Sequence, residues 1–434
     1  MRVLLFMENT YCGGMDTFVV TLVDNWPYRD DELVLVCNRN HPGLNVIETR
    51  VKRRLVMIGH RLPVHSEVMR KIGLRRSGSI VGRAVSFLLR YTLFVYYMIA
   101  LPSLLLRQKA DRLLVVAGGY PGGDTCRAAI IVWALFRRRP RGVFSFHNLV
   151  MAAGWHVKCL ESIIDLMVGC LSGHIVTVSD AAAESVRRRP ILARMKKVQR
   201  IYYGINPPPH NSNGAKDGNL KDELGLAPSS KVCLKLATYE PRKGHEFLLR
   251  AFRKVVQRVP LAHMVLCGHG LPEQLEAVRL QARRLRLENN VHIFTFREDT
   301  SYLLRNADIL VMASQQFESF GLSCVEAMAH RVPVVATRVG GLPEVVRDGE
   351  GGFCVRPDDV DGYAARIVAL LEDEALNREQ GHNGYQRFKR LFTSGRMAAQ
   401  YARLIRKSGY SLPQGEEFLQ HESFSVSASS DSEL

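Results

Sequence analysis

The sequence lacks the residue spacings by which cysteine builds metal sites or disulfide scaffolds. It has nine cysteines, an odd number, and no two of them stand in a CxxC spacing. Most lie inside apolar runs such as LVLVCN and HMVLCG, so we expect small buried side chains in a reducing compartment. HExxH, Walker-loop and GxGxxG motifs and an ordered Ser–His–Asp set are also missing where each would be needed. This argues against the enzyme classes that depend on those motifs.

Long hydrophobic runs are scarce as well. The N-terminal MRVLLFM is too short for a signal peptide and is expected to be a first strand. One long uncharged run covers residues 91–106, with Arg90 and Arg107 at its ends and Pro102 inside. A spanning helix needs about 20 apolar residues. Three interpretations stay open: a buried or domain-face helix, a helix lying on a bilayer between arginine-rich flanks, and a spanning helix.

What the sequence does contain is material for two full cores. Its 434 residues are 47% hydrophobic and 23% charged, as in ordinary soluble proteins. The net charge of +17 is uneven, because residues 1–205 hold 30 basic and 14 acidic side chains and the rest hold 29 and 28. A cationic N-terminal half predicts an anionic partner. The basic runs at 137–139 and 187–189 lack interleaved aromatics, so we expect no nucleic acid.

Short continuous apolar runs alternate with helix-period segments along both halves. In the first half, the expected strands are 2–7, 32–37, 112–117, 142–147 and 174–179. In the second half, they are 232–237, 263–267, 290–294, 308–313 and 333–337. Such alternation is typical of parallel sheets covered by helices on both faces. The predicted fold class is α/β, with two tandem doubly wound Rossmann-like domains facing each other across a cleft.

The domain boundaries follow from changes in composition. We expect an N-terminal domain over 1–205 and a second domain over 231–392. The Pro-, Gly-, Asn- and Ser-rich stretch 206–230 is predicted to be a linker with one short helix. A C-terminal helix over 393–410 is expected to pack back on the N-terminal domain. Residues 411–434 contain seven serines and no Lys or Arg, which predicts a disordered tail.

The most informative segment is Glu318-Ser-Phe-Gly-Leu-Ser-Cys-Val-Glu326. Phe320, Gly321 and Leu322 stand at a predicted helix start, where free backbone N–H groups and the helix dipole favour an anion. Eight helical steps of about 1.5 Å separate the two carboxylates by roughly 12 Å, enough to reach both ends of one nucleotide sugar. Carboxylates suit this work because they accept hydrogen bonds from vicinal hydroxyls.

With this segment, the chain resembles the retaining glycosyltransferases of family four, also called group 1, which have the GT-B fold. The matching stretches are ESFGLSCVEAMAHRVPVVATRVGGLPEVVRDGEGGFCVRPDD (318–359), PRKGHEFLLRAF (241–252), LCGHG (266–270), NADILVMAS (306–314) and VSDAAAESV (178–186). The resemblance implies sugar transfer from a nucleotide-diphosphate donor with retention at the anomeric carbon. It implies no metal and no cofactor beyond that donor.

The resemblance implies that 1–205 is the acceptor side and that 231–392 binds the nucleotide sugar. It also assigns roles to residues of the second domain. Glu326 aligns with the glutamate that binds the ribose hydroxyls, and Glu318 with the one that holds the donor sugar near its anomeric centre. Lys243 aligns with the catalytic phosphate-binding lysine. The family often places an arginine five residues before that lysine, but here the position is Thr238. One phosphate contact is therefore missing or is supplied by another residue such as Arg242.

Further positions are implied with less specific motifs. Gly13 and Gly14 match a glycine loop that approaches the donor phosphate or the acceptor closely. His147, at a strand end, matches a histidine that contacts the donor sugar, with a core histidine as the alternative. Gly268 lies in a turn beside the nucleotide, and Arg297 lies in the loop that flanks the base.

The resulting hypothesis is a metal-independent glycosyltransferase of polysaccharide or glycolipid biosynthesis, acting on a glycan or lipid-linked acceptor. A nucleotide-sugar 2-epimerase on the same fold and a non-catalytic binding protein are the alternatives. The basic N-terminal half predicts a cytoplasmic protein that is peripheral on the cytoplasmic face of an anionic membrane.

Overall fold

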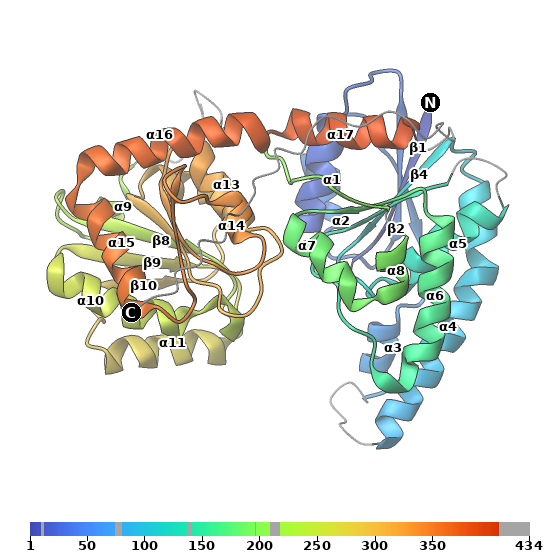
Figure 1. Cartoon of the computed structure of the whole chain (residues 1–434), viewed down its shortest axis with the longest axis horizontal. Coiled ribbons are helices and arrows are strands. Elements are labelled where there is room, and N and C mark those ends of the chain that lie inside the picture. The colour runs from blue at the N-terminus through green and yellow to red at the C-terminus, as the bar shows by residue number, and fades with distance from the viewer. Residues whose placement is uncertain (10–12, 74–79, 137–140, 196, 209–217, 408–434) are drawn as a thin grey trace, which may run out of the picture.

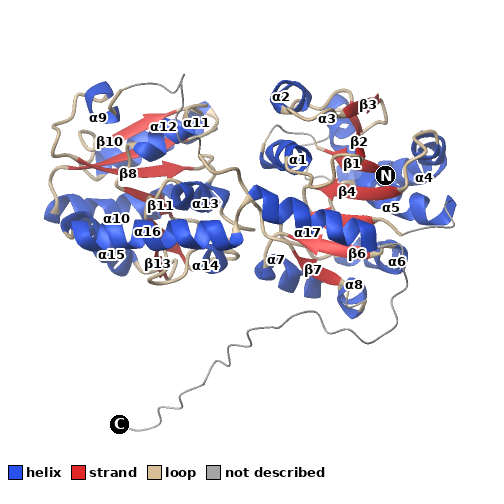
Figure 2. Ribbon diagram, turned by 90° about the horizontal axis from the view of Figure 1, so that it is seen from above, coloured by secondary structure: helices blue, strands red, loops and turns tan. Residues whose placement is uncertain are grey.

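The computed structural model describes residues 1–9, 13–73, 80–136, 141–195, 197–208 and 218–407. Two α/β domains lie side by side, each with a parallel sheet between layers of helices (Figures 1 and 2). The expected fold class is confirmed. The disordered tail predicted for 411–434 and most of the predicted linker, 209–217, lie outside the described residues.

The N-terminal sheet has the strand order β3-β2-β1-β4-β5-β6-β7, and all its neighbours are parallel. Its strands are β1 (Arg2–Glu8), β2 (Glu32–Asn38), β3 (Val56–His60), β4 (Arg112–Ala117), β5 (Val143–Phe146), β6 (His174–Thr177) and β7 (Val198–Arg200). Its helices are α1 (Gly14–Asp24), α2 (Leu44–Arg50), α3 (His65–Lys71), α4 (Ile80–Leu106), α5 (Asp124–Phe136), α6 (Lys158–Leu171), α7 (Asp180–Glu184) and α8 (Pro190–Arg194). Both faces of the sheet are buried, which explains the continuous apolar runs of β1, β2 and β4.

The C-terminal sheet has the order β10-β9-β8-β11-β12-β13. Its strands are β8 (Lys231–Leu236), β9 (Ala262–Cys267), β10 (Val291–Phe294), β11 (Ile309–Met312), β12 (Val334–Thr337) and β13 (Gly352–Val355). The helices are α9 (Leu220–Glu223), α10 (His245–Arg258), α11 (Pro272–Arg284), α12 (Thr300–Arg305), α13 (Leu322–Ala329), α14 (Leu342–Val345), α15 (Val360–Glu372) and α16 (Glu374–Leu391). The short helix α9 stands within the stretch where the sequence predicts one.

The last described helix, α17 (Ser394–Lys407), returns to the N-terminal domain (Figure 1). Met397, Tyr401 and Ile405 lie in the same buried cluster as Met15 and Phe18 of the N-terminal domain. The chain therefore crosses between the domains twice, once before β8 and once between α16 and α17. Because α17 packs into the N-terminal core, it holds the segment between α16 and α17 against the N-terminal domain.

The uncharged run 91–106 forms the greater part of α4, a helix of 27 residues that contains Pro102. Phe94, Tyr97, Leu101 and Leu105 are buried in the N-terminal core. The opposite side of the helix is exposed. By length and composition alone, 81–106 is apolar enough to cross a membrane, and one side of the helix packs against the domain core.

Candidate functional site

The candidate site lies where the C-terminal sheet changes direction. The chain runs outward from β8 through β9 to β10 and then returns to β11 on the other side of β8. At such a switch point, the loops after the two central strands diverge and leave room for a ligand. Lys243 comes from the segment after β8, and Glu318 comes from the loop after β11. The topology thus brings together two residues that are 75 positions apart.

Lys243 and Glu318 form an ion pair in which Nζ lies 2.5 Å from Oε2. Both side chains are largely buried, so water screens the pair weakly. Ser314 donates a second hydrogen bond to the same carboxylate oxygen, at 3.1 Å. The geometry holds one carboxylate and one ammonium next to each other at the carboxyl edge of the sheet.

The start of α13 stands directly after this pair. Gly321 is its N-cap and adopts a left-handed backbone with φ of 100°, which favours glycine. A Cβ atom there would also lie 2.6 Å from the Leu342 side chain. The Phe320 side chain is packed against Tyr203 and Phe392, so this residue can offer a ligand only its backbone. The free N–H groups of the first turn of α13 favour a bound anion.

Glu326 lies in the middle of α13, and burial raises the pKa of its carboxyl to about 7. No described residue donates a hydrogen bond to this carboxylate, whereas Glu318 is held by Lys243 and Ser314. A partly buried acid without a donor is disposed to accept hydrogen bonds from a ligand. The two glutamates therefore lie in different electrostatic environments on one segment.

One residue of the site was missed from the sequence. Lys235 is fully buried within β8, and its ammonium donates a hydrogen bond of 2.9 Å to the backbone oxygen of Lys243. The pKa of Lys235 is lowered to about 7, first by burial and then by the nearby Lys243 ammonium, while Glu318 acts in the opposite direction. The signal was present, because a lysine in the middle of the apolar run VCLKLA has no solvent to face.

Thr238 stands where the family often has an arginine, and it shares a carboxylate partner with Arg242. Thr238 donates a hydrogen bond of 3.0 Å to one carboxylate oxygen of Glu240, and Arg242 forms an ion pair of 2.6 Å with the other. Arg242 also lies over the ring of Phe317, 4.7 Å from its centre. Arg242 thus contacts Glu240 and Phe317, while the Lys235 amine lies beside the Lys243 backbone.

Gly268 and Arg297 follow β9 and β10 at the same edge of the sheet. Gly268 lets the turn approach β8, since a Cβ atom would lie 1.9 Å from the Ala237 oxygen. The Arg297 guanidinium pairs with Glu223 of α9 and with Asp299, each at 2.6 Å. Arg297 therefore ties the short helix to the domain.

In the N-terminal domain, Gly13 caps α1 and Gly14 begins it, and open space surrounds both positions. His147 does not join the other candidate residues. Its Nδ1 lies 2.5 Å from Tyr203 Oη, and its Nε2 lies 3.1 Å from Ser145 Oγ. Burial lowers the pKa of the imidazole to about 3, so the ring is neutral and both nitrogens have partners. This arrangement matches the core-histidine alternative.

The carboxyl edges of the two sheets are in direct contact beside the site. Ser179, which follows β6, donates a hydrogen bond of 2.6 Å to the Ser319 oxygen, next to Glu318. The Glu344 carboxylate accepts hydrogen bonds of 2.7 Å from the backbone N–H groups of Asp180 and Ala181, at the start of α7. These contacts couple the position of the Glu318 loop to the N-terminal domain.

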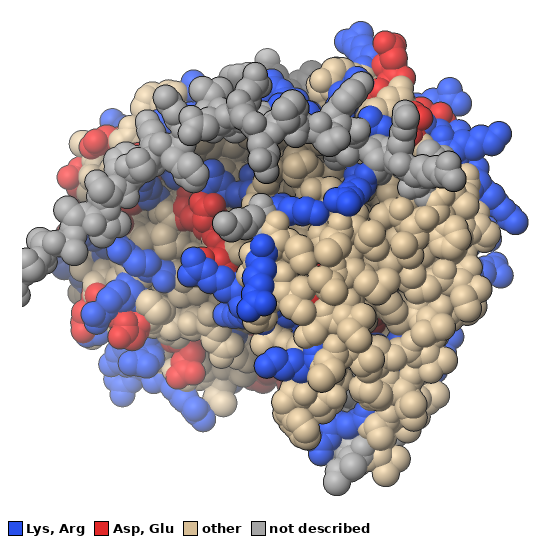
Figure 3. Space-filling model, turned by 45° about the vertical axis from the view of Figure 1, so that its right-hand side comes forward, with Lys and Arg blue, Asp and Glu red and all other residues tan. Residues whose placement is uncertain are grey.

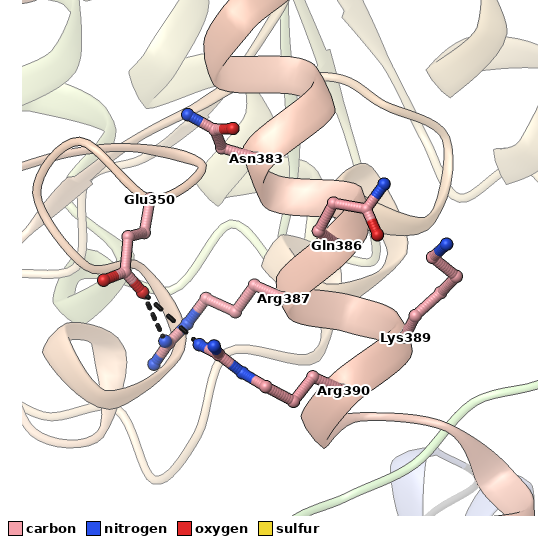
Figure 4. Close-up of a pocket in the computed structure, with 6 residues that line it drawn as sticks. All are labelled: Glu350, Asn383, Gln386, Arg387, Lys389 and Arg390. Carbon is pink, nitrogen blue, oxygen red and sulfur yellow. Dashed lines mark hydrogen bonds and ion pairs between the residues drawn. The ribbon is translucent and has the colours of Figure 1, made fainter.

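The cavity drawn in Figure 4 lies elsewhere, on the outer side of α16. It is lined by Glu350, Asn383, Gln386, Arg387, Lys389 and Arg390. Glu350 neutralises two of its cations, Arg387 at 3.1 Å and Arg390 at 3.6 Å. It contains none of the residues assigned to the donor. The described residues hold no cluster of three or more His, Cys, Asp or Glu side chains suited to a metal ion.

The domain that holds the candidate site is similar to known proteins. Residues 217–387 match the family model of glycosyl transferases group 1. The C-terminal domain belongs to this family. N-acetyl-alpha-D-glucosaminyl L-malate synthase of Bacillus anthracis is 34% identical over 182 residues, covering 42% of this chain and 47% of that protein. Phosphatidyl-myo-inositol mannosyltransferase of Mycobacterium tuberculosis H37Rv is 38% identical over 159 residues, covering 35% and 41%. The matches thus span about half the length of these relatives, or less.

Solved structures show the fold over most of the chain. HepE of Anabaena, in complex with UDP and glucose, superposes with a TM-score of 0.69 at 20% identity, covering 94% of this chain and all of that one. A glycosyltransferase from Rickettsia africae gives a TM-score of 0.73 at 16% identity, covering 94% and 98%. The two-domain GT-B architecture expected from the resemblance is confirmed.

Proposed function

We propose that the protein transfers a sugar from a nucleotide-diphosphate donor to a glycan or lipid-linked acceptor, with retention and without a metal ion. The observation that carries the proposal is the Lys243–Glu318 ion pair in front of α13. Glu318 can hold sugar hydroxyls there while Lys243 and the first amides of α13 receive the diphosphate. Glu326, farther along the helix, is suited to accept hydrogen bonds from the ribose.

In the proposed reaction, the bond between the anomeric carbon and the diphosphate oxygen breaks, and charge develops on the leaving group. Lys243 and the helix amides stabilise that charge through fixed electrostatics. The acceptor hydroxyl forms the new bond on the same face of the sugar, and its proton passes to the departing phosphate. Lys235 supports the cationic side of the site by holding the Lys243 backbone.

A panel of labelled nucleotide sugars, incubated with the protein and a membrane extract, tests the proposal. We expect transfer from one donor, with retained anomeric configuration, in the presence of EDTA. Absence of both transfer and nucleotide binding would contradict the proposal. Proton NMR of the donor without acceptor would reveal a 2-epimerase, and binding without turnover would indicate a non-catalytic protein.

We further propose that the protein works on the cytoplasmic face of an anionic membrane, through its basic N-terminal domain. A bilayer with anionic lipids attracts basic residues near it by about 1 kcal/mol each, within the Debye length. Phosphatidyl-myo-inositol mannosyltransferase, one of the relatives, is named for a lipid acceptor. A lipid-linked acceptor would be reached most easily by an enzyme that rests on the bilayer.

A further inference from the structure

The helix α4 is apolar on its exposed side as well as on the side that packs in the core. A helix on a soluble domain turns its polar side outward, but the exposed stripe of α4 is formed by Leu88, Val95, Tyr96 and Ile99. Ile99 is 73% exposed. No charged residue stands between Arg90 and Arg107, and the small hydroxyl side chains exposed on this stretch, Thr92 and Ser103, are uncharged. The helix presents to solvent the kind of surface that a protein normally buries.

The helix α6 also exposes apolar side chains, and it buries its acidic ones. Leu160, Ile163 and Leu166 are exposed at helical spacing, and Leu166 is 48% exposed. The acidic residues of α6, Glu161 and Asp165, are buried instead. A solvated helix would place these side chains the other way round.

The buried acids of α6 are neutralised inside the domain. Arg127 pairs with Glu161 at 2.9 Å, and Arg189 pairs with Asp165 at 2.8 Å. Tyr91 of α4 donates a hydrogen bond of 3.1 Å to Glu161, which places α4 beside α6. The charges thus lie below the surface, and the exposed apolar side chains of α4 and α6, which both pack against α5, lie outside them.

Figure 3 shows this side of the N-terminal domain as a broad uncharged expanse, with Lys and Arg gathered toward its margins. Arg83 and Arg107 are exposed near the two ends of α4, and Lys158 is exposed at the start of α6. Trp155, just before α6, is 89% exposed. Indole rings favour the headgroup level of a bilayer, and basic side chains favour anionic headgroups.

We propose that this α4–α6 face, meaning the exposed apolar side chains of both helices together with Trp155, inserts into the headgroup and outer acyl region of a lipid bilayer. The basic rim then lies at the level of anionic headgroups. Because the other side of α4 is packed in the domain core, the helix lies in the interface and does not cross the bilayer. This inference deepens the proposed function, since it fixes where a lipid-linked acceptor is met.

The proposed attachment also determines which edge of the N-terminal sheet faces the membrane. Trp155 belongs to the segment that leaves the carboxyl end of β5, the edge of the N-terminal sheet that contacts the Glu318 loop through Ser179. An embedded Trp155 therefore keeps this edge near the headgroups. A polar acceptor head attached to a lipid would then be presented from the membrane side.

Flotation of the full-length protein with vesicles tests the proposal. Vesicles of phosphatidylcholine alone and with phosphatidylglycerol are compared at low and high salt. We expect binding to the anionic vesicles that persists in part at high salt, because insertion of apolar area is not screened. Ile99→Glu and Ile163→Glu should each weaken binding about tenfold or more. Leu280→Glu is the matched control, since Leu280 on α11 of the other domain is 45% exposed.

Tryptophan fluorescence gives a readout that needs no destabilising change. Trp26 and Trp133 are buried, so Trp155 is the exposed one of the three tryptophans. Anionic vesicles should shift the emission to the blue and protect it from acrylamide, and Trp155→Phe should abolish both effects. Unchanged emission, or equal flotation of the wild type and both glutamate variants, would overturn the proposal.

The outcomes also separate this inference from the proposed transfer activity. Ile99→Glu should leave nucleoside diphosphate binding unchanged while it reduces flotation. If the vesicles bind but no sugar is transferred, the attachment stands and the activity fails. If the wild type forms oligomers that Ile99→Glu dissociates and it binds no vesicles, the face joins two copies of the chain and the bilayer proposal is wrong.

Discussion

The two domains share one architecture but keep their charges in different places. The N-terminal domain buries a balanced network around Glu161 and leaves apolar helices on the outside. The C-terminal domain covers its apolar core and gathers Lys235, Lys243 and Glu318 at the switch point of its sheet. The comparison teaches that the fold fixes where a site can form, while the placement of buried charge decides what each domain contacts.

The largest expected effect comes from the C-terminal pair. Lys243→Met removes the cation facing the leaving diphosphate, so transfer should fall about 100- to 1,000-fold, as when one fixed electrostatic contact to the transition state is lost. Single-turnover transfer of a labelled sugar measures it. Lys254→Met is the matched control, because Lys254 forms an exposed ion pair of 2.7 Å with Asp361. Equal losses in both variants would remove the assignment.

The N-terminal network should respond in stability and not in donor binding. Glu161→Gln leaves Arg127 and Arg189 without their shared buried carboxylate, at a cost of about 3–5 kcal/mol in the free energy of unfolding. Urea denaturation measures the loss, and calorimetry should show unchanged nucleotide affinity for the folded protein. A loss below about 1 kcal/mol would mean that the buried network is not needed for stability.

A smaller effect should appear in the pH dependence of stability. The pKa of Lys235 is lowered from 10.5 to about 7, so the folded chain binds this proton less tightly than the unfolded chain. Stability should therefore rise with pH between about 7 and 10.5, and part of this rise should vanish in Lys235→Met. Thermal unfolding across this range measures it, with Lys231→Met, at the half-buried start of β8, as the control. Parallel curves for wild type and Lys235→Met would contradict the lowered pKa.

Much of the fold was predictable because its central strands are continuous apolar runs. The strands β3, β7 and β13 were missed, and all three lie at the edges of the sheets. An edge strand pairs on one side only, so its sequence needs less apolar continuity, as VQR of β7 shows. Edge strands leave a weaker pattern in the sequence.

The part of the site that lies within one sequence motif was predictable. The segment from Glu318 to Glu326 identified the helix start, but the pairing of Glu318 with Lys243 depends on the switch between β8 and β11. The burial of Lys235 and the engagement of both His147 nitrogens depend on neighbours far away in the chain. Sequence spacing does not contain such contacts.

The central claim is that the C-terminal domain holds a nucleotide through α13, and calorimetry of UDP and GDP with wild type and Glu326→Gln tests it most directly. Because the pKa of Glu326 is raised to about 7, its carboxylate becomes available to ribose hydroxyls as the pH rises from 6 to 8. We predict that the affinity of wild type relative to Glu326→Gln rises about tenfold over that range for one of the two nucleotides. No binding of either nucleotide, or equal affinities of the two proteins at both pH values, would contradict the account.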